Sequence, residues 1–146
     1  MKFLIINGPN LNLLGKREPE IYGSETLDEI MTWLKATPEA RGHQLEHFQS
    51  NHEGSIIERI HNAWEDVDGI IINPGAFTHY SYAIRDALAA VGITTVEVHL
   101  SDINQREDFR KISVIAPVCL GQVSGLGKES YLEGLKKLIH SFINKN

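Results

Sequence analysis

FLIINGPNLNLLGKREPEIYG, residues 3–23, joins a short apolar run to a loop that is rich in polar side chains and turn formers. An apolar run of this length predicts a buried β-strand, and Gly8 with Pro9 must end it. The loop therefore begins at the carboxyl end of a strand, the edge where open α/β sheets bind their ligands. Four polar residues of this loop are candidates for chemistry there: Asn10, Asn12, Arg17 and Tyr22.

The rest of the chain alternates helical and strand-like patterns. Thr26 and Glu29 have the spacing of a capping box before a helix over residues 27–35. The further expected elements are a strand between residues 43 and 49, a helix over 56–64, a buried strand over 69–72, a helix over 81–91, a strand over 94–98, a strand in the apolar run 114–120 and a closing helix over 132–142. This order predicts an α/β fold, a flavodoxin-like three-layer sandwich with a five-stranded parallel sheet.

Candidate polar residues follow three of these strands. In a parallel sheet the carboxyl ends of the first, third and fourth strands meet at one rim. The loops after them hold Asn10, Arg17 and Tyr22, then Asn73 and His79, then His99 and Ser101. We therefore expect these side chains to converge on one site.

Composition narrows the function classes. At 146 residues, the chain fits one domain over residues 1–146, enough to bury roughly two-thirds of its unfolded surface. A formal charge of -5 without a Lys/Arg cluster argues against a nucleic-acid partner. The short apolar start and the lack of about 18 consecutive apolar residues argue against a signal peptide and a membrane span, so the cytoplasm is the expected location. The single cysteine, Cys119, is expected to pack as a small hydrophobe.

Common nucleotide and metal motifs do not fit. In the turn GQVSGLGKES, residues 121–130, Gln122 replaces the first glycine of a phosphate loop and Glu129 replaces its magnesium-binding hydroxyl. The dinucleotide fingerprint also fails, and residues 7–15 lack the hydroxyls that a flavin phosphate would need. The seven histidines form no HExxH motif, and His43 and His47 read as solvated surface. We therefore expect no metal and no cofactor.

Two histidines and a tyrosine remain as candidates for acid and base chemistry. His79 and His99 each follow the end of an expected strand. Tyr22 can be an apolar plug of its loop or a base, because a cation within roughly 4 to 6 Å would favour its phenolate. Arg17 or Arg110 can supply that cation, but Arg17 can equally pair with a neighbouring glutamate. The residues alone leave both interpretations open.

Three segments carry a resemblance to a known family: GPNLNLLGKREPEIYG at 8–23, NPGAFTHYSYAIRDAL at 73–88 and EVHLSDINQREDFR at 97–110, with GLGKESYLEGL closing the set at 125–135. In this order they resemble the type II 3-dehydroquinate dehydratases, or type II dehydroquinases. The resemblance implies a flavodoxin-like fold. It also implies the dehydration of 3-dehydroquinate to 3-dehydroshikimate in the shikimate pathway of aromatic amino acid biosynthesis, without a cofactor.

The resemblance assigns catalytic roles position by position. Tyr22 would remove a proton next to the substrate ketone, and Arg17 would keep this base ionised. Asn10 would stabilise the resulting enolate through an ordered water. His99 would protonate the departing hydroxyl, and Glu97, two residues earlier on the same face of the strand, would orient that imidazole.

The resemblance also assigns binding contacts and an assembly. Asn73, with the backbone around Leu100 and Ser101, would hold the substrate carboxylate, and His79 and Arg110 would contact the ring hydroxyls. The loop from Arg17 to Gly23, hinged at Gly15 and Gly23, would close over the substrate. Asp86 lies where the family places an acidic residue that can reach a neighbouring subunit's site, in a homododecamer built as a tetramer of trimers.

Two other function classes compete with this hypothesis. A flavodoxin-like binding module would hold a small carboxylate or phosphate without turnover, and would not need both Tyr22 and His99. An imine-forming lyase would need a buried lysine, whereas Lys16 and Lys128 lie in polar turns. Turnover by the purified protein would argue against the binding module. Borohydride trapping of substrate on the chain would favour the imine-forming lyase.

Overall fold

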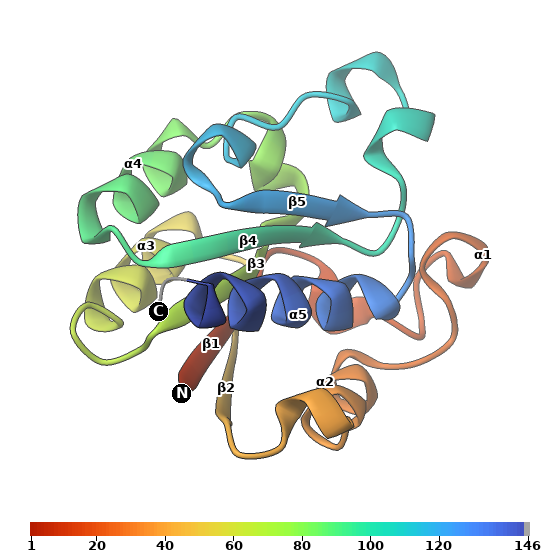
Figure 1. Ribbon diagram of the computed structural model, residues 1–146. Coiled ribbons are helices and arrows are strands. Elements are labelled where there is room, and N and C mark those ends of the chain that lie inside the picture. Colours follow the sequence, from red (N-terminus) through yellow and green to blue (C-terminus); the bar gives the residue numbers. More distant parts are fainter. Residues whose placement is uncertain (145–146) are drawn as a thin grey trace.

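A computed structural model describes residues 1–144, apart from the side chains of residues 21 and 22. One sheet contains β1 (Lys2–Asn7), β2 (Gln44–Gln49), β3 (Gly69–Asn73), β4 (Thr94–His99) and β5 (Gly121–Ser124). Neighbouring strands are parallel throughout, in the order β2-β1-β3-β4-β5. The helices are α1 (Pro19–Tyr22), α2 (Leu27–Lys35), α3 (Glu53–Asn62), α4 (Tyr82–Val91) and α5 (Glu129–Ile143). The predicted flavodoxin-like α/β sandwich is confirmed (Figure 1).

The sheet separates two apolar cores because strand side chains alternate between its faces. On β1, Phe3 and Ile5 pack with α2 and α5, whereas Leu4 and Ile6 pack with α3 and α4. The last helix lies close against the sheet at Gly134, where a Cβ atom would come within 2.8 Å of the Val98 side chain. The three layers therefore follow from the apolar stripes of the sequence (Figure 1).

Local signals start two helices where the sequence predicts them. The Thr26 hydroxyl accepts the Glu29 backbone N–H at 3.1 Å, and α2 begins at the next residue after Thr26. Ser81 does the same for α4, accepting the Ile84 backbone N–H at 3.1 Å. Each cap satisfies a backbone donor that the first helical turn leaves without an intrahelical partner.

The predicted fifth strand is wrong in position, because residues 114–120 do not join the sheet. Pro117 lacks an N–H for a ladder, and the segment Ala116–Val118 forms a 3-10 turn. The Ser113 hydroxyl accepts the backbone N–H groups of Ile115 and Ala116, which a strand would direct to its neighbour. The strand is instead Gly121–Ser124, directly after the apolar run.

Two smaller expectations also need correction. Trp64 lies beyond the end of α3 and is 64% exposed, so it does not belong to the apolar stripe of that helix. His47 is half-buried rather than solvated, because it shares a face of β2 with Leu45, which packs against the core under α2. Burial accordingly lowers the pKa of His47.

Cys119 packs beside the apolar cluster under α3 and α4, in agreement with its expected structural role. Its Sγ donates to the Ile115 carbonyl oxygen at 3.5 Å. Burial raises the pKa of this thiol to about 12, so it stays protonated and a poor nucleophile near neutral pH.

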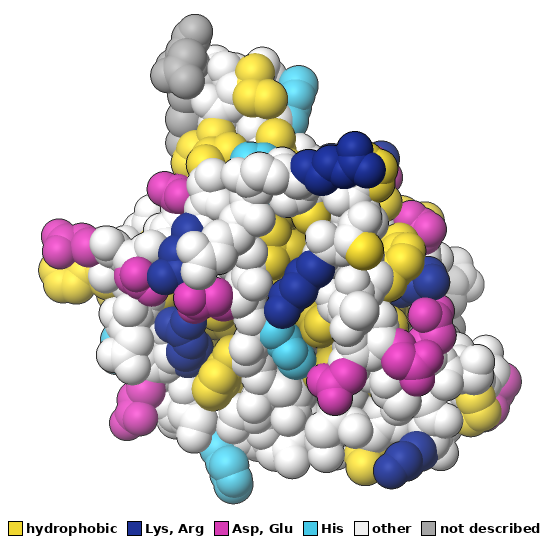
Figure 2. Space-filling model, turned by 90° about the horizontal axis from the view of Figure 1, so that it is seen from below, with side chains coloured by type: hydrophobic (Ala, Val, Ile, Leu, Met, Phe, Trp, Pro, Cys, Tyr) yellow, Lys and Arg dark blue, Asp and Glu magenta, His cyan; other side chains and the backbone are white. Residues whose placement is uncertain are grey.

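Charges are mixed over the surface. On the face shown in Figure 2, basic and acidic side chains are interspersed rather than gathered into fields of one sign. None of the helices in the described part of the chain is both long and apolar enough to span a bilayer.

Candidate active site

A pocket lies at the carboxyl ends of β1, β3 and β4, as the topology predicts. It is lined by Pro9, Asn10, Leu11, Leu14, Arg17, Asn73, Gly75, Ala76, His79, His99, Leu100, Ser101, Ile103, Arg106 and Arg110. The backbones after β1 and β3 meet closely beneath it, since a Cβ atom on Gly8 would lie 2.4 Å from the Pro74 carbonyl oxygen. Only glycine permits that approach, and the Gly8 backbone N–H joins the two segments by donating to the Asn73 carbonyl oxygen at 2.8 Å.

Most of the predicted site residues line this pocket. They are Asn10, Arg17, Asn73, His79, His99, Leu100, Ser101 and Arg110. Glu97 lies behind His99, while Asp86 is exposed on α4 and is not among the lining residues of the described chain. Asn12 is exposed and accepts from Gln49 Nε2 at 3.5 Å. The side chain of Tyr22 lies outside the described residues.

The charged side chains that line the pocket are arginines among the described residues. Arg17, Arg106 and Arg110 line it, whereas no aspartate or glutamate does so among the described residues. Arg110 pairs with Glu107 at 2.6 Å, and Arg17 lies 3.7 Å from Glu18. Sequence reasoning missed Arg106, although it lies four residues before Arg110 in the same segment after β4. Such a lining suits an anionic ligand with a carboxylate, which guanidinium groups bind well.

His99 and Glu97 form a buried pair on β4. Alternation along the strand places both on one face, and His99 Nε2 lies 2.6 Å from Glu97 Oε2. An ionised carboxylate only accepts, so Nε2 carries the proton and the ring presents its Nδ1 side elsewhere. Glu97 is fully buried and His99 is 6% exposed, so this contact holds the imidazole in one orientation at the pocket wall.

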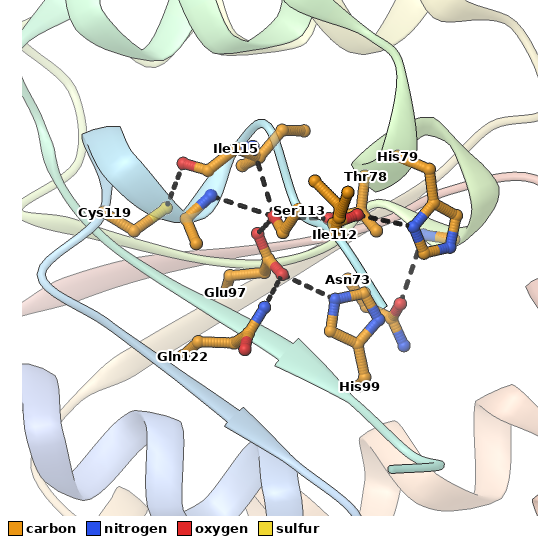
Figure 3. Close-up of polar contacts among 12 residues, drawn as sticks. Asn73, Thr78, His79, Glu97, His99, Ile112, Ser113, Ile115, Cys119 and Gln122 are labelled. Carbon is orange, nitrogen blue, oxygen red and sulfur yellow. Dashed lines mark hydrogen bonds and ion pairs between the residues drawn. The ribbon is translucent and has the colours of Figure 1, made fainter. Parts of the chain in front are cut away.

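Two further donors reach the Glu97 carboxylate. Ser113 Oγ donates to Oε1 at 2.6 Å, and Gln122 Nε2 donates to Oε2 (Figure 3). Burial alone would raise the pKa of Glu97, but the hydrogen bond and the charge interaction with His99, with the hydrogen bonds from Ser113 and Gln122, outweigh burial and lower the pKa. Sequence reasoning did not find Ser113 or Gln122, because they lie 16 and 25 residues beyond Glu97.

His79 is held by the segment after β4. Its Nδ1 lies 2.7 Å from the Ile112 carbonyl oxygen, and an acceptor at that distance requires a proton on Nδ1. Burial is the main reason why the pKa of His79 is lowered. A neutral ring with a protonated Nδ1 keeps Nε2 as a hydrogen-bond acceptor, which suits a ligand hydroxyl.

Asn10 lies in the loop after β1, and Asn73 is the last residue of β3. Asn10 has a positive φ of 70°, and its backbone N–H donates to Asn51 Oδ1 at 3.0 Å. Asn73 Oδ1 accepts the Gly75 backbone N–H at 3.3 Å, and its Nδ2 donates to Tyr131 at 3.1 Å. The backbone of Asn10 and the side-chain amide of Asn73 are therefore tied to the scaffold near the pocket.

No lysine lines the pocket among the described residues. Lys128 instead pairs with Glu25 at 3.1 Å and lies over the Trp33 ring. In the part of the chain that the structure describes, no group of three or more His, Cys, Asp or Glu residues could hold a metal ion.

The ionised Glu97 side chain should make folding stability fall on acidification. Its folded pKa lies below the ordinary value of 4.5, so its contribution is complete above about pH 4.5 and disappears as the pH falls through the lower folded pKa. Glu97→Gln should remove this part of the acid dependence and lower stability at pH 7 by roughly 1 to 3 kcal/mol. Urea unfolding between pH 3 and 7 measures both effects.

The exposed Glu58→Gln variant is the matched control for that titration. It should retain the wild-type stability at pH 7 and the wild-type slope on acidification. Identical slopes for Glu97→Gln and the wild type would contradict the predicted stabilisation by the carboxylate.

Comparisons with known proteins agree with one another. A family model described as "Dehydroquinase class II" matches residues 1–139. The chain is 55% identical over 137 residues to a 3-dehydroquinate dehydratase of Bacillus pumilus, covering 94% of this chain and 93% of that protein. It is 57% identical over 138 residues to one of Caldicellulosiruptor bescii, covering 94% and 95%. The crystal structure of the type II dehydroquinase from Butyrivibrio crossotus matches with a TM-score of 0.92 and 51% identity, over 95% of this chain and 97% of that chain.

Proposed function

The chain belongs to the class II dehydroquinase family, and from this premise we infer that it is a 3-dehydroquinate dehydratase, a hydro-lyase. The observation that carries the inference is the pocket at the rim of the sheet. It combines three arginines for an anionic substrate with a buried Glu97–His99 pair for proton transfer. This arrangement serves catalysis better than simple capture of an anion, which would not need an oriented imidazole.

We propose that the elimination proceeds through an enolate, with Tyr22 as the base. Tyr22 takes the proton from the carbon next to the ketone, and the electrons of the broken C–H bond move onto the carbonyl oxygen. Arg17 lines the pocket on the same loop, where its positive charge favours a phenolate. Asn10, through an ordered water, stabilises the enolate oxygen, a type of preorganised contact that can contribute a few kcal/mol.

His99 then completes the reaction as the general acid. The enolate oxygen re-forms the ketone C=O. The electron pair of the enolate C=C bond then forms a new C=C bond to the carbon that bears the departing hydroxyl, and the C–O bond to that hydroxyl breaks. A proton from His99 converts that hydroxyl to water. Glu97 keeps the His99 ring oriented, and its negative charge offsets the positive charge of the protonated imidazole. The buried contact between the two side chains supports this role.

The same pocket accounts for substrate binding in this proposal. Asn73 and the backbone around Leu100 and Ser101 hold the carboxylate, and His79 and Arg110 contact the ring hydroxyls. Arg106 adds a third positive charge beside the anion. The loop from Arg17 to Gly23 closes over the substrate and excludes water, with φ values of 88° at Gly15 and 87° at Gly23 supporting these glycines as hinges.

We further propose the biological setting that the resemblance implies. The enzyme would work without a cofactor in the cytoplasm, in the shikimate pathway that supplies aromatic amino acids. It would assemble as a homododecamer, a tetramer of trimers, in which the exposed Asp86 reaches a neighbouring site. Light scattering on the purified protein tests the assembly.

Turnover by the purified protein is the direct test of the function. With 3-dehydroquinate added, absorbance of the conjugated enone of 3-dehydroshikimate should rise at the same rate with and without a chelator. No rise in absorbance, with tight binding of the substrate, would leave a binding module instead. A rate that falls on chelation and returns with added metal would contradict the cofactor-free mechanism.

A further inference from the structure

A buried polar cluster connects the pocket lining with the core beneath it: Asn73 at the end of β3 lines the pocket, and Asn7 at the end of β1 and Tyr131 in the first turn of α5 lie behind it. Asn7 and Tyr131 are 0% exposed and Asn73 is 3% exposed. Asn7 and Asn73 are paired in the register of the sheet, and α5 crosses that face (Figure 1). Burying a polar group costs free energy unless the group is hydrogen-bonded, so these three side chains must satisfy one another.

The hydrogen bonds assign the donors and acceptors of the cluster. Tyr131 has one hydroxyl proton and donates it to Asn7 Oδ1. Its oxygen can therefore only accept from Asn73, whose Nδ2 lies 3.1 Å away. At the other end of the amide, Asn73 Oδ1 accepts the Gly75 backbone N–H at 3.3 Å.

These contacts allow only one orientation of the Asn73 amide. A flipped amide would place its oxygen against the phenol oxygen and its N–H₂ against the Gly75 N–H. Asn73 lines the pocket, and one of its two Nδ2 protons is used by Tyr131. The second remains as a donor for a ligand. Burial strongly raises the pKa of Tyr131, so the hydroxyl keeps its proton over the working pH range.

We propose that Tyr131 is a positioning residue for substrate binding, which holds the Asn73 amide with its N–H toward the substrate carboxylate. This inference rests on the proposed function, in which Asn73 binds that carboxylate. A flipped amide would present an oxygen to the anion and repel it. Asn7 completes the arrangement by directing the phenol proton away from Asn73.

Tyr131→Phe tests the proposal, because it removes the hydroxyl and leaves the ring in the core. KM should rise about tenfold, the effect of one hydrogen bond to a charged group, while kcat changes less than about threefold. Thr37→Val is the matched control. It removes another buried hydroxyl, bound to the Leu34 carbonyl oxygen at 2.7 Å and not part of the pocket lining, and should leave KM unchanged.

A double-mutant cycle separates positioning from general destabilisation. If Tyr131 acts through Asn73, Tyr131→Phe should add nothing to KM on an Asn73→Ala background. If the KM increases of Tyr131→Phe and Asn73→Ala multiply in the double variant, the proposal is overturned. An unchanged KM in Tyr131→Phe alone would also overturn it. A wild-type protein without turnover would instead refute the proposed function, so the two failures are distinguishable.

A measurement on the wild-type protein keeps the test valid even if Tyr131→Phe does not fold. In ¹⁵N-labelled protein, one side-chain amide proton of Asn73 should give a nuclear Overhauser effect to the Tyr131 ring and keep its chemical shift when 3-dehydroshikimate is added, because Tyr131 holds it in the core. The other should shift when 3-dehydroshikimate is added. No contact of either proton with the Tyr131 ring, or no shift of either, would overturn the proposal.

Discussion

Tyr22→Phe should lower kcat by about 10² to 10⁴-fold, the usual cost of losing a general base. Phenylalanine keeps the ring but has no oxygen to take the proton next to the ketone, so the enolate does not form. Substrate binding should change little, because the pocket residues hold the carboxylate and hydroxyls. Steady-state absorbance at saturating 3-dehydroquinate measures the loss, and Tyr82→Phe, on the exposed face of α4, is the matched control.

Exchange of the substrate proton provides a second measurement of this step. In D₂O, the wild-type enzyme should exchange the proton next to the ketone, and Tyr22→Phe should not. Full turnover by Tyr22→Phe would refute the tyrosine base. A pH profile of the wild type that is unchanged in Arg17→Ala would contradict the role of that arginine in keeping the base ionised.

His99→Ala should lower kcat by a similar factor, about 10² to 10⁴, for the opposite reason. The base remains, so the enolate still forms, but no acid protonates the departing hydroxyl. This variant should therefore dehydrate the substrate slowly while still exchanging the proton next to the ketone in D₂O. His61→Ala, at an exposed position on α3, should keep the wild-type rate.

The pair of variants distinguishes the two proton transfers of the proposed mechanism. Loss of exchange in His99→Ala would place that residue in the first step rather than the second. Wild-type dehydration by His99→Ala would contradict its role as the acid, and the Glu97–His99 pair would then serve only the stability of the sheet.

The order of layers could be predicted from the sequence because strand and helix periodicities are local. Phe3, Leu4, Ile5 and Ile6 form a continuous apolar run in the printed sequence, and because strand side chains alternate between the two faces of a sheet, such a run predicts a strand buried on both faces. The same topology explains why Asn73, His79 and His99 could be expected at one rim. The position of β5 was predicted wrongly. The apolar run at residues 114–120 indicated a strand, but Pro117 has no N–H for the hydrogen-bond ladder of a sheet.

The hydrogen-bonded partners of the site depended on contacts between distant segments. Ser113 and Gln122 reach Glu97 only because β5 lies beside β4 and the turn before it folds back. Arg106 was missed because an arginine in a polar segment has no periodicity to distinguish it. The resemblance to a family supplied roles for Tyr22 and Arg17 that the residues themselves left open.

The α/β layers and the strand ends at which polar residues gather could be predicted from the spacing of apolar side chains, which is local. The orientation of those polar residues depends on contacts that form only in the folded chain. Tyr131 bonds Asn7 across 124 residues and Asn73 across 58, through contacts that exist only when α5 packs on the sheet. The loop in residues 3–23 carries Asn10 and Arg17 to the pocket, but helix packing and strand register determine the orientation of the amide at the end of β3.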